Sequence, residues 1–398
     1  MWRYGLTILI AVLAISGIGA YYAIGRLNHL PEYKLETVQG EPEEGAAVSL
    51  SGSYLGDMRS EPLNVNIEGS IYRSEDKVFR KRMMDARSWF YNQPDIQKLL
   101  KDHKSFMRGK GYETGFYRDE ELVIYADVTT KGLNSDAQKS VLRLSLLSED
   151  SGKVTDFEQT ILEMPDNGQL SIQDVQRVDD EAHLLFRKYI DRGITEELVV
   201  YVFDIGTGEQ LRHSTLASWS DKNKYKSDAQ TARVIASDYI SAPQDMIFVI
   251  LNGKEYTYSY RSGLLTELTD PLWHKALGTG MAHSLQQDNF YYSEVRQDRI
   301  VLSRYNFITK EQETSYVTLT AEQLGVGVIK SALIRSNRVY LLADDKAGIP
   351  GAAVLDLANG ELLYAGRAVE VGDEGKTGAE LSENLRLLNI NIVEKLAD

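Results

Sequence analysis

The chain has 398 residues, of which 43% are hydrophobic and 26% are charged, a globular composition with room for one large core or two domains. Its net charge of −14 argues against nucleic acid as a partner, because phosphate binding requires a basic surface. The chain contains no cysteine, which excludes disulfides, zinc–thiolate sites and thiol catalysis.

The first 26 residues predict a membrane anchor. No charged residue lies between Arg3 and Arg26, so the uncharged run from Tyr4 to Gly25 is 22 residues long. As a helix this run extends ~33 Å, enough to cross the ~30 Å hydrocarbon core of a bilayer. Aromatic residues stand near both of its ends, as in membrane-interface belts. We predict a retained transmembrane helix; the alternative is a cleaved signal peptide with a poor cleavage site over residues 18–20.

The short tail before this span favours a topology in which the tail is cytoplasmic and the bulk of the chain is extracytoplasmic. Residues 27–47 contain Pro31, Pro42, two glycines and five glutamates. That composition predicts a flexible, self-repelling acidic linker that holds the body away from the membrane. The predicted division is therefore an anchor over 1–26, an acidic linker over 27–47 and an extracytoplasmic body over 48–398.

A helical hairpin is predicted over residues 75–110, after two strands expected at 48–55 and 63–72. The apolar residues there recur with a helical period in two stripes. They are Val78, Phe79, Met83, Ala86, Trp89 and Phe90 in the first helix, and Ile96, Leu99, Leu100, His103, Phe106 and Met107 in the second. Pro94 suits the first turn of the second helix, and Gly109 suits its end.

The hairpin carries a charge opposite to that of the rest of the chain. Residues 77–110 hold ten Lys or Arg against three Asp, a net +7 that leaves −21 elsewhere. The candidate partner-binding residues are Arg80, Arg82, Lys98, Lys101, Lys104 and Arg108. One hypothesis is that they dock an acidic protein domain, an anionic envelope polymer or lipid head groups. The alternative is that these long side chains only face solvent or the acidic body.

Strands resume at residue 111 and recur in groups of four. In the clearest unit, residues 199–213, apolar side chains alternate along a strand that runs into a glycine turn. We expect Gly206 and Gly208 to supply the positive φ of this turn. Similar turns occur at 152, 263, 310 and 360, so successive turns are 47 to 56 residues apart. A four-stranded unit with a period near 50 is typical of a β-propeller blade.

Third strands in these units end in the pattern Tyr/Leu-x-x-Asp-x-x-x-Gly, carried by Tyr201 and Asp204 and by residues 354–360. In this the chain resembles the β-propeller repeat proteins of the bacterial envelope, at the level of single blades and over roughly residues 111–366. The resemblance implies an all-β, β-propeller-like fold of about six four-stranded blades and carries no functional residue. The predicted transmembrane helix and helical hairpin insertion add to it. The alternative architecture is a pair of β-sandwiches.

The C-terminal residues 381–396 predict a closing strand, because Leu388, Ile390 and Ile392 alternate with Asn389 and Asn391. Paired with the two N-terminal strands, it would form a sixth blade from both ends of the chain. Such closure removes exposed sheet edges, which otherwise template aggregation.

No motif predicts catalysis, a cofactor or a metal ion. Residues 372–377 look like a truncated phosphate loop, but Glu370 stands where its first glycine belongs. Acidic loops near Asp221 and Asp344 lack the spacing of a calcium loop, and the six histidines lack metal-ligand spacing. We expect a non-enzymatic binding or regulatory protein of the envelope. The alternative is an envelope enzyme, glycan-active or dependent on a quinone cofactor, with its site at the propeller channel.

Overall fold

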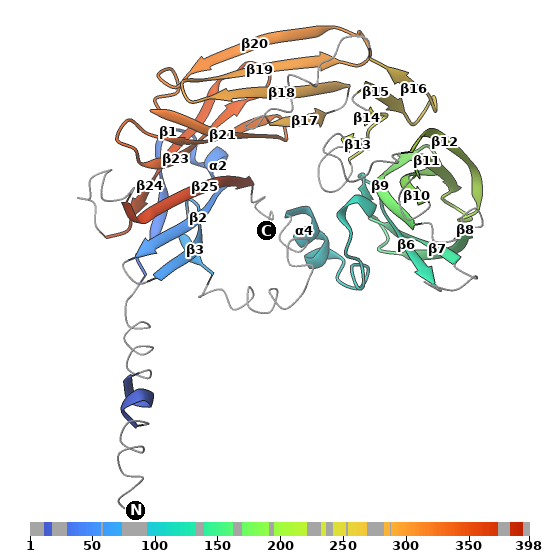
Figure 1. The fold of residues 1–398 in the computed structure, drawn as a ribbon, viewed down its shortest axis with the longest axis horizontal. Helices are drawn as coiled ribbons and strands as arrows, with labels where there is room; N and C mark the ends of the chain where they lie inside the picture. The colour runs from blue at the N-terminus through green and yellow to red at the C-terminus, as the bar shows by residue number, and fades with distance from the viewer. Residues whose placement is uncertain are drawn as a thin grey trace, which may run out of the picture.

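The structure is a computed structural model that describes residues 12–17, 30–56, 59–73, 94–131, 139–161, 169–190, 195–220, 232–235, 242–251, 254–268, 282–286, 288–372 and 383–392. Within these residues the protein consists mainly of six antiparallel sheets, which follow one another along an arc in Figure 1. We number them sheet 1 to sheet 6 in chain order. The all-β prediction and the grouping of strands in fours are thereby confirmed.

Sheets 1 to 3 have four strands each. Sheet 1 has the order β25 (Leu385–Ile392), β2 (Val48–Gly56), β3 (Arg59–Val65), β4 (Ser70–Tyr72). Sheet 2 consists of β5 (Phe116–Arg118), β6 (Leu122–Lys131), β7 (Lys139–Ser148) and β8 (Val154–Ile161). Sheet 3 consists of β9 (Gln169–Val178), β10 (Glu181–Ile190), β11 (Thr195–Asp204) and β12 (Gln210–Ser220).

Sheets 4 to 6 continue the same order, and the last gains a fifth strand. Sheet 4 consists of β13 (Ala232–Ile235), β14 (Met246–Leu251), β15 (Lys254–Ser259) and β16 (Leu265–Glu267). Sheet 5 consists of β17 (His283–Gln286), β18 (Asn289–Arg296), β19 (Arg299–Asn306) and β20 (Gln312–Thr320). Sheet 6 consists of β21 (Val328–Arg335), β22 (Arg338–Asp344), β23 (Pro350–Asp356), β24 (Leu362–Glu370) and β1 (Tyr33–Gly40).

The alternation read in residues 199–213 places a different core on each face of β11. Tyr201 and Phe203 pack in an apolar cluster between sheets 2 and 3. Val200 and Val202 pack in another cluster between sheets 3 and 4. Because successive side chains of a strand point to opposite faces, one apolar strand serves both neighbouring interfaces. The central strands of sheet 6 alternate in the same way.

The five repeated turns share one geometry, which is the physical basis of the sequence repeat. The turn residues Gly152, Gly208, Gly263, Lys310 and Gly360 have φ between 63° and 76°. Each donates its N–H to the carbonyl four residues earlier, at 2.8 to 3.0 Å. The expectation for Gly206 was wrong, since this turn requires positive φ only at Gly208.

Both ends of the chain complete sheets, as the predicted closure requires. Strand β25 pairs with β2, with Ile390 opposite Leu50 and Ile392 opposite Val48. The prediction was wrong for Leu388, which lies at a β-bulge and is 65% exposed. The bulge shifts the alternation by one residue, so Leu387 is buried instead.

The flexible linker expected over residues 27–47 is also corrected in part, because residues 33–40 form β1 and pair with β24. Its side chains Tyr33 and Leu35 are buried in the core between sheets 6 and 1. The short helix α2 (Pro42–Gly45) follows, and Glu44 accepts hydrogen bonds at 2.8 and 2.9 Å from Arg338 of β22. These hydrogen bonds hold the pKa of Glu44 below its usual value. The sequence suggested glutamates that only repel one another, but this one is paired.

Apolar clusters join sheets 2 and 3, 3 and 4, 4 and 5, 5 and 6, and 6 and 1. Within the described part of the chain, no such cluster joins sheet 1 to sheet 2. Helix α4 (Pro94–Asp102) packs instead on the face of sheet 2 that is turned away from sheet 3. In the view of Figure 1, α4 lies between sheets 1 and 2.

The predicted helical hairpin is observed in its second half. Helix α4 begins at Pro94 as expected but ends at Asp102, and turns cover residues 104–109 where the prediction continued the helix. Residues 74–93, which include the predicted first helix, lie outside the described residues.

The predicted membrane span is described only over residues 12–17, which are helical and exposed. The remainder of Tyr4 to Gly25 lies outside the described residues. None of the helices in the described ranges combines the length and the apolar character needed to cross a bilayer.

The bulge in β25 predicts opposite effects for two adjacent leucines. Leu387→Ala should lower the free energy of unfolding by about 2–5 kcal/mol, because it leaves a cavity in a packed core. Leu388→Ala should change it by less than about 0.5 kcal/mol, because that side chain is exposed. Urea unfolding of both variants checks the register. Equal losses would contradict the bulge, and a larger loss for Leu388→Ala would restore the alternation predicted from sequence.

Candidate functional site

The face of sheet 2 turned away from sheet 3 is covered by side chains of two kinds. Val123, Tyr125 and Leu147 pack against Leu99 and other apolar residues of α4 and the turn after it. Farther along, the same face presents polar side chains on β6, β7 and β8. Apolar packing therefore ends partway across this face, and a groove begins there.

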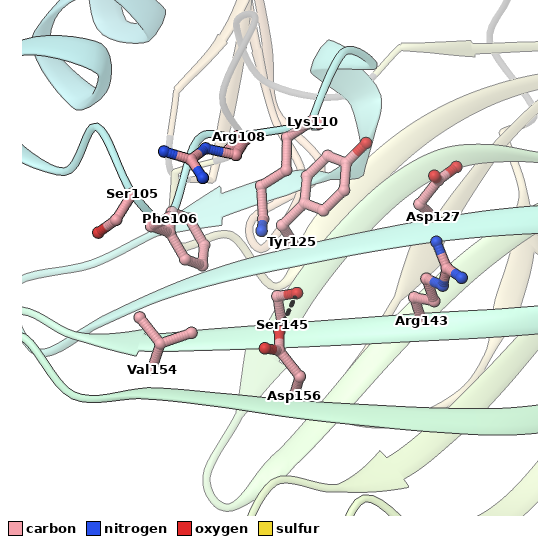
Figure 2. A pocket seen from close by; sticks show the side chains of 11 residues that line it. Ser105, Phe106, Arg108, Lys110, Tyr125, Asp127, Arg143, Ser145, Val154 and Asp156 are labelled. Carbon is pink, nitrogen blue, oxygen red and sulfur yellow. Dashed lines mark hydrogen bonds between the residues drawn. The ribbon is translucent and has the colours of Figure 1, made fainter.

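The groove has a volume of about 580 Å³. It lies between the turn that follows α4 and strands β6 to β8, as Figure 2 shows. Its lining residues are Ser105, Phe106, Arg108, Gly109, Lys110, Tyr125, Asp127, Arg143, Ser145, Val154 and Asp156. The volume is that of an ordinary ligand cleft.

Lys110 is the most deeply placed charge of the groove, with only 9% of its surface exposed. Its Nζ atom lies 4.1 Å from the ring centroid of Phe106 and 5.3 Å from that of Tyr125. In Figure 2 the ammonium points between these rings towards Ser145 and Asp156. Two aromatic faces therefore provide the local electrostatic contact of this cation.

Burial lowers the pKa of Lys110 below its usual value, because water is removed from the charged form. The carboxylates of Asp156 and Asp127 act in the opposite direction but only partly compensate. Within the described part of the chain no carboxylate oxygen lies within ion-pair distance of Nζ. Asp156 instead accepts a hydrogen bond of 2.5 Å from Ser145, and Arg143, another cation that lines the groove, pairs with Glu158 at 2.7 Å.

The structure partly assembles the partner-binding residues predicted from sequence. Lys98, Lys101, Lys104 and Arg108 are exposed on α4 and on the turn after it, and Arg108 also lines the groove. None of these four forms an ion pair with a carboxylate among the described residues. Arg80 and Arg82 lie outside the described residues. Lys110, the residue of the hairpin that the groove buries, was not among the predicted contacts.

A signal for the groove was present in the sequence. Residues 198–203 of β11, a strand covered on both faces, are all apolar. In sheet 2, by contrast, Asp127, Arg143 and Ser145 stand between apolar neighbours on β6 and β7, and Asp156 of β8 lies opposite Ser145. That alternation indicates that one face of the sheet is not covered by another sheet.

A charged cluster fixes the turn after α4 to sheet 2. The His103 Nε2 atom lies 3.0 Å from Glu149, and the other carboxylate oxygen of Glu149 lies 2.8 Å from Arg118. Arg118 is the last residue of β5, and Glu149 lies in the turn between β7 and β8. The helix and its basic surface are therefore held on the sheet by polar contacts as well as by the apolar core.

A second, smaller cavity of about 130 Å³ lies between sheets 3 and 4. His183, which is almost fully buried, lines it together with Arg212 and Tyr258. Nε2 of His183 lies 3.0 Å from Glu181, which also accepts bonds of 2.7 and 2.5 Å from Arg212. Burial lowers the pKa of His183, which favours its neutral form. The charges of this cavity are thus satisfied within the protein.

The alternative predicted from sequence, an enzyme site at a propeller channel, would require polar groups of the strands that line the channel to converge there. The two fully buried polar residues of β9 are used instead to join sheets. Asp174 accepts a hydrogen bond of 2.6 Å from Tyr260, and Gln176 accepts one of 3.0 Å from the Gln244 N–H. Across the described ranges, no group of three or more possible metal ligands is found.

Comparison with known proteins identifies no family. No family model matches the chain, and no curated protein sequence matches it significantly. Among solved structures, an uncharacterised protein of Listeria monocytogenes is 11% identical, with a TM-score of 0.32 over 62% of this chain and 65% of that one. An acylaminoacyl peptidase of Pyrococcus horikoshii is 11% identical, with a TM-score of 0.26 over 65% and 45%. The Dos1 propeller is 12% identical, with a TM-score of 0.27 over 56% and 53%. The chain thus spans less than two thirds of each of these structures.

The environment of Lys110 predicts that its charge lowers stability. Lys110→Met should raise the free energy of unfolding at pH 7 by about 1 kcal/mol, because it removes a buried charge and keeps an aliphatic chain between the rings. The folded-state pKa lies below the unfolded value near 10.5, so the unfolded wild type binds more protons in the interval between them. Wild-type stability therefore rises with pH in that interval, and the advantage of the variant should shrink towards pH 10.5.

Urea unfolding from pH 7 to pH 10.5 measures this difference. The exposed Lys346→Met has the same charge change and should stay within about 0.5 kcal/mol of wild type at each pH. A Lys110→Met protein that is less stable than wild type across the whole range would contradict the prediction.

Proposed function

We propose that the protein is a non-enzymatic binding or regulatory protein of the cell envelope, and that it takes its partner beside α4, on the face of sheet 2 that is turned away from sheet 3. The observation that carries this proposal is the position of the groove. Five interfaces between sheets are filled by apolar clusters, whereas this face presents an open, charged groove. Surfaces that packing leaves open and polar are where recognition residues are expected.

Charge supports an acidic segment of a protein as the partner. The four exposed cations of α4 and its turn have no carboxylate partner among the described residues, so an incoming acidic surface would not need to displace one. Their sign is opposite to the net charge of −14 of the whole chain. A local basic surface on an acidic body orients a charged partner and increases its association rate.

The uncharged run from Tyr4 to Gly25 supports anchoring in a membrane, with the sheets on the extracytoplasmic side. The helical residues 12–17 within it expose Val12, Leu13 and Ile15, and they stand apart from the sheets in Figure 1. An exposed apolar helix is unfavourable in water and favourable in lipid. The span would hold the groove close to other proteins of the same membrane.

Charge reversal on α4 should weaken partner capture. Lys98, Lys101, Lys104 and Arg108 are all changed to Glu in the full chain, which is then crosslinked in membranes and purified with its partners. Because each exposed ion pair is worth about 0.2–1 kcal/mol, four reversals should lower capture at least about fourfold. Capture by the wild type should also fall with salt, since the Debye length shrinks from ~10 Å at 0.1 M to ~3 Å at 1 M.

The control reverses four exposed cations on sheets 4 to 6 and their turns: Lys254, Arg261, Lys310 and Lys346. It has the same total charge change and should capture partners nearly as well as the wild type. Equal capture by all three folded proteins would sink the proposal. If the wild type binds only to anionic vesicles or wall polymer, its partner is that anionic surface and not a protein.

Topology is tested on intact cells from which the wall has been removed. If residues 4–25 span the membrane with a cytoplasmic N-terminus, protease added outside should digest the sheets, because they are extracytoplasmic. A cytoplasmic marker protein in the same cells serves as the control and should survive. Complete protection of both proteins would show that the proposed orientation is wrong.

A further inference from the structure

We propose that Lys110 binds a single carboxylate of an extended peptide that lies in the groove along β8. This inference rests on the proposed function, because it names the chemistry of the partner at that site. Its basis is a buried cation that points into an open groove and has no ionic partner within the described residues.

The buried charge of Lys110 favours an anionic ligand. Buried ammonium groups normally pair with an anion, because desolvation strongly disfavours an isolated charge. Lys110 is 9% exposed, and its neighbours Phe106 and Tyr125 offer only ring faces. The ammonium group of Lys110 points past these rings into the groove (Figure 2). A ligand carboxylate placed there would donate no proton and would accept a charge-assisted hydrogen bond from Nζ.

Two aspartates in the groove limit the number of negative charges on the ligand. Asp127 and Asp156 also line the groove, and both carboxylates would repel a chain of closely spaced negative charges. Arg143 is already paired with Glu158, so it contributes little further attraction. The lining therefore suits a ligand with one carboxylate at Lys110 and neutral or basic groups over the two aspartates. Uniformly anionic polymers do not meet that requirement.

The position of β8 at an edge of sheet 2 favours an extended peptide as the ligand. Val154 and Asp156 of β8 line the groove, and β8 is one of the two edge strands of sheet 2. An edge strand offers backbone N–H and C=O groups to an extended peptide, which can add to the sheet as a further strand. A peptide bound in this way places alternate side chains over the groove, so that one of them reaches Lys110.

The test uses two pools of short acetylated and amidated peptides composed of Thr, Val, Ser and Gly. Every peptide in one pool contains a single Glu, and its counterpart in the other pool has Gln at that position. The full chain, purified in nonionic detergent, is incubated with both pools, and retained peptides are quantified by mass spectrometry. The wild type should retain Glu peptides about tenfold more than their Gln counterparts, as expected for one charge-assisted hydrogen bond.

Two variants make the assignment specific. Lys110→Met should reduce the ratio of Glu to Gln retention to about one while the protein remains folded, as measured by its unfolding temperature. The exposed control Lys346→Met has the same charge change and should keep the wild-type ratio. A wild-type ratio near one, or a ratio in Lys110→Met equal to that of the wild type, would overturn the inference. Binding of anionic phospholipid vesicles that depends on Lys110, without peptide retention, would also overturn it.

The α4 charge-reversal variant separates this inference from the proposed function. If that variant loses its crosslinked partner while Lys110→Met leaves the Glu preference intact, the surface binds a partner and only the role of Lys110 is wrong. If the reversal has no effect on partner capture and neither pool is retained by the wild type, both the inference and the proposed function fail.

Discussion

Coverage of the apolar faces of the sheets is the constraint on which the rest of the structure depends. A strand such as β11 is apolar on both sides, so sheet 3 is stable only between two neighbours. The ends of the chain meet this requirement where sheets 6 and 1 join, because β1 completes sheet 6 and β25 completes sheet 1. Strand β1, from near the N-terminus, pairs with β24, and β25, from near the C-terminus, pairs with β2, so segments distant in the sequence complete the two sheets that pack together at that interface.

The same constraint explains the arrangement at sheet 2. One of its faces packs on sheet 3, and the described residues place α4 rather than a sheet on the other. A helix covers a narrower strip than a sheet does, so α4 protects Val123 and Leu147 and, among the described residues, leaves the rest of the face open. The polar side chains there are consistent with contact with water, and Lys110 is buried at the boundary between the two regions.

A buried lysine is a costly way to fill that boundary if packing were its only purpose. A methionine would make similar contacts with Phe106 and Tyr125 without losing the hydration of a charge. In the role that we propose, the charge is a binding group, whose desolvation is offset when an anion arrives. The exposed cations of α4 suit the earlier stage of that proposed encounter, because an approaching partner meets them before it enters the groove.

The sequence by itself determined the strand repeat, the positions of the turns and the C-terminal strand. These depend on local signals: alternation along residues 199–213, positive φ at Gly208, and apolar residues in β25. Tertiary structure decided what local signals do not encode. The bulge that exposes Leu388 depends on the register of β2, and the strand formed by residues 33–40 depends on the free edge of β24. The burial of Lys110 likewise depends on which element covers sheet 2. The local sequence of a basic segment does not indicate whether one of its lysines faces water or, like Lys110, two aromatic rings.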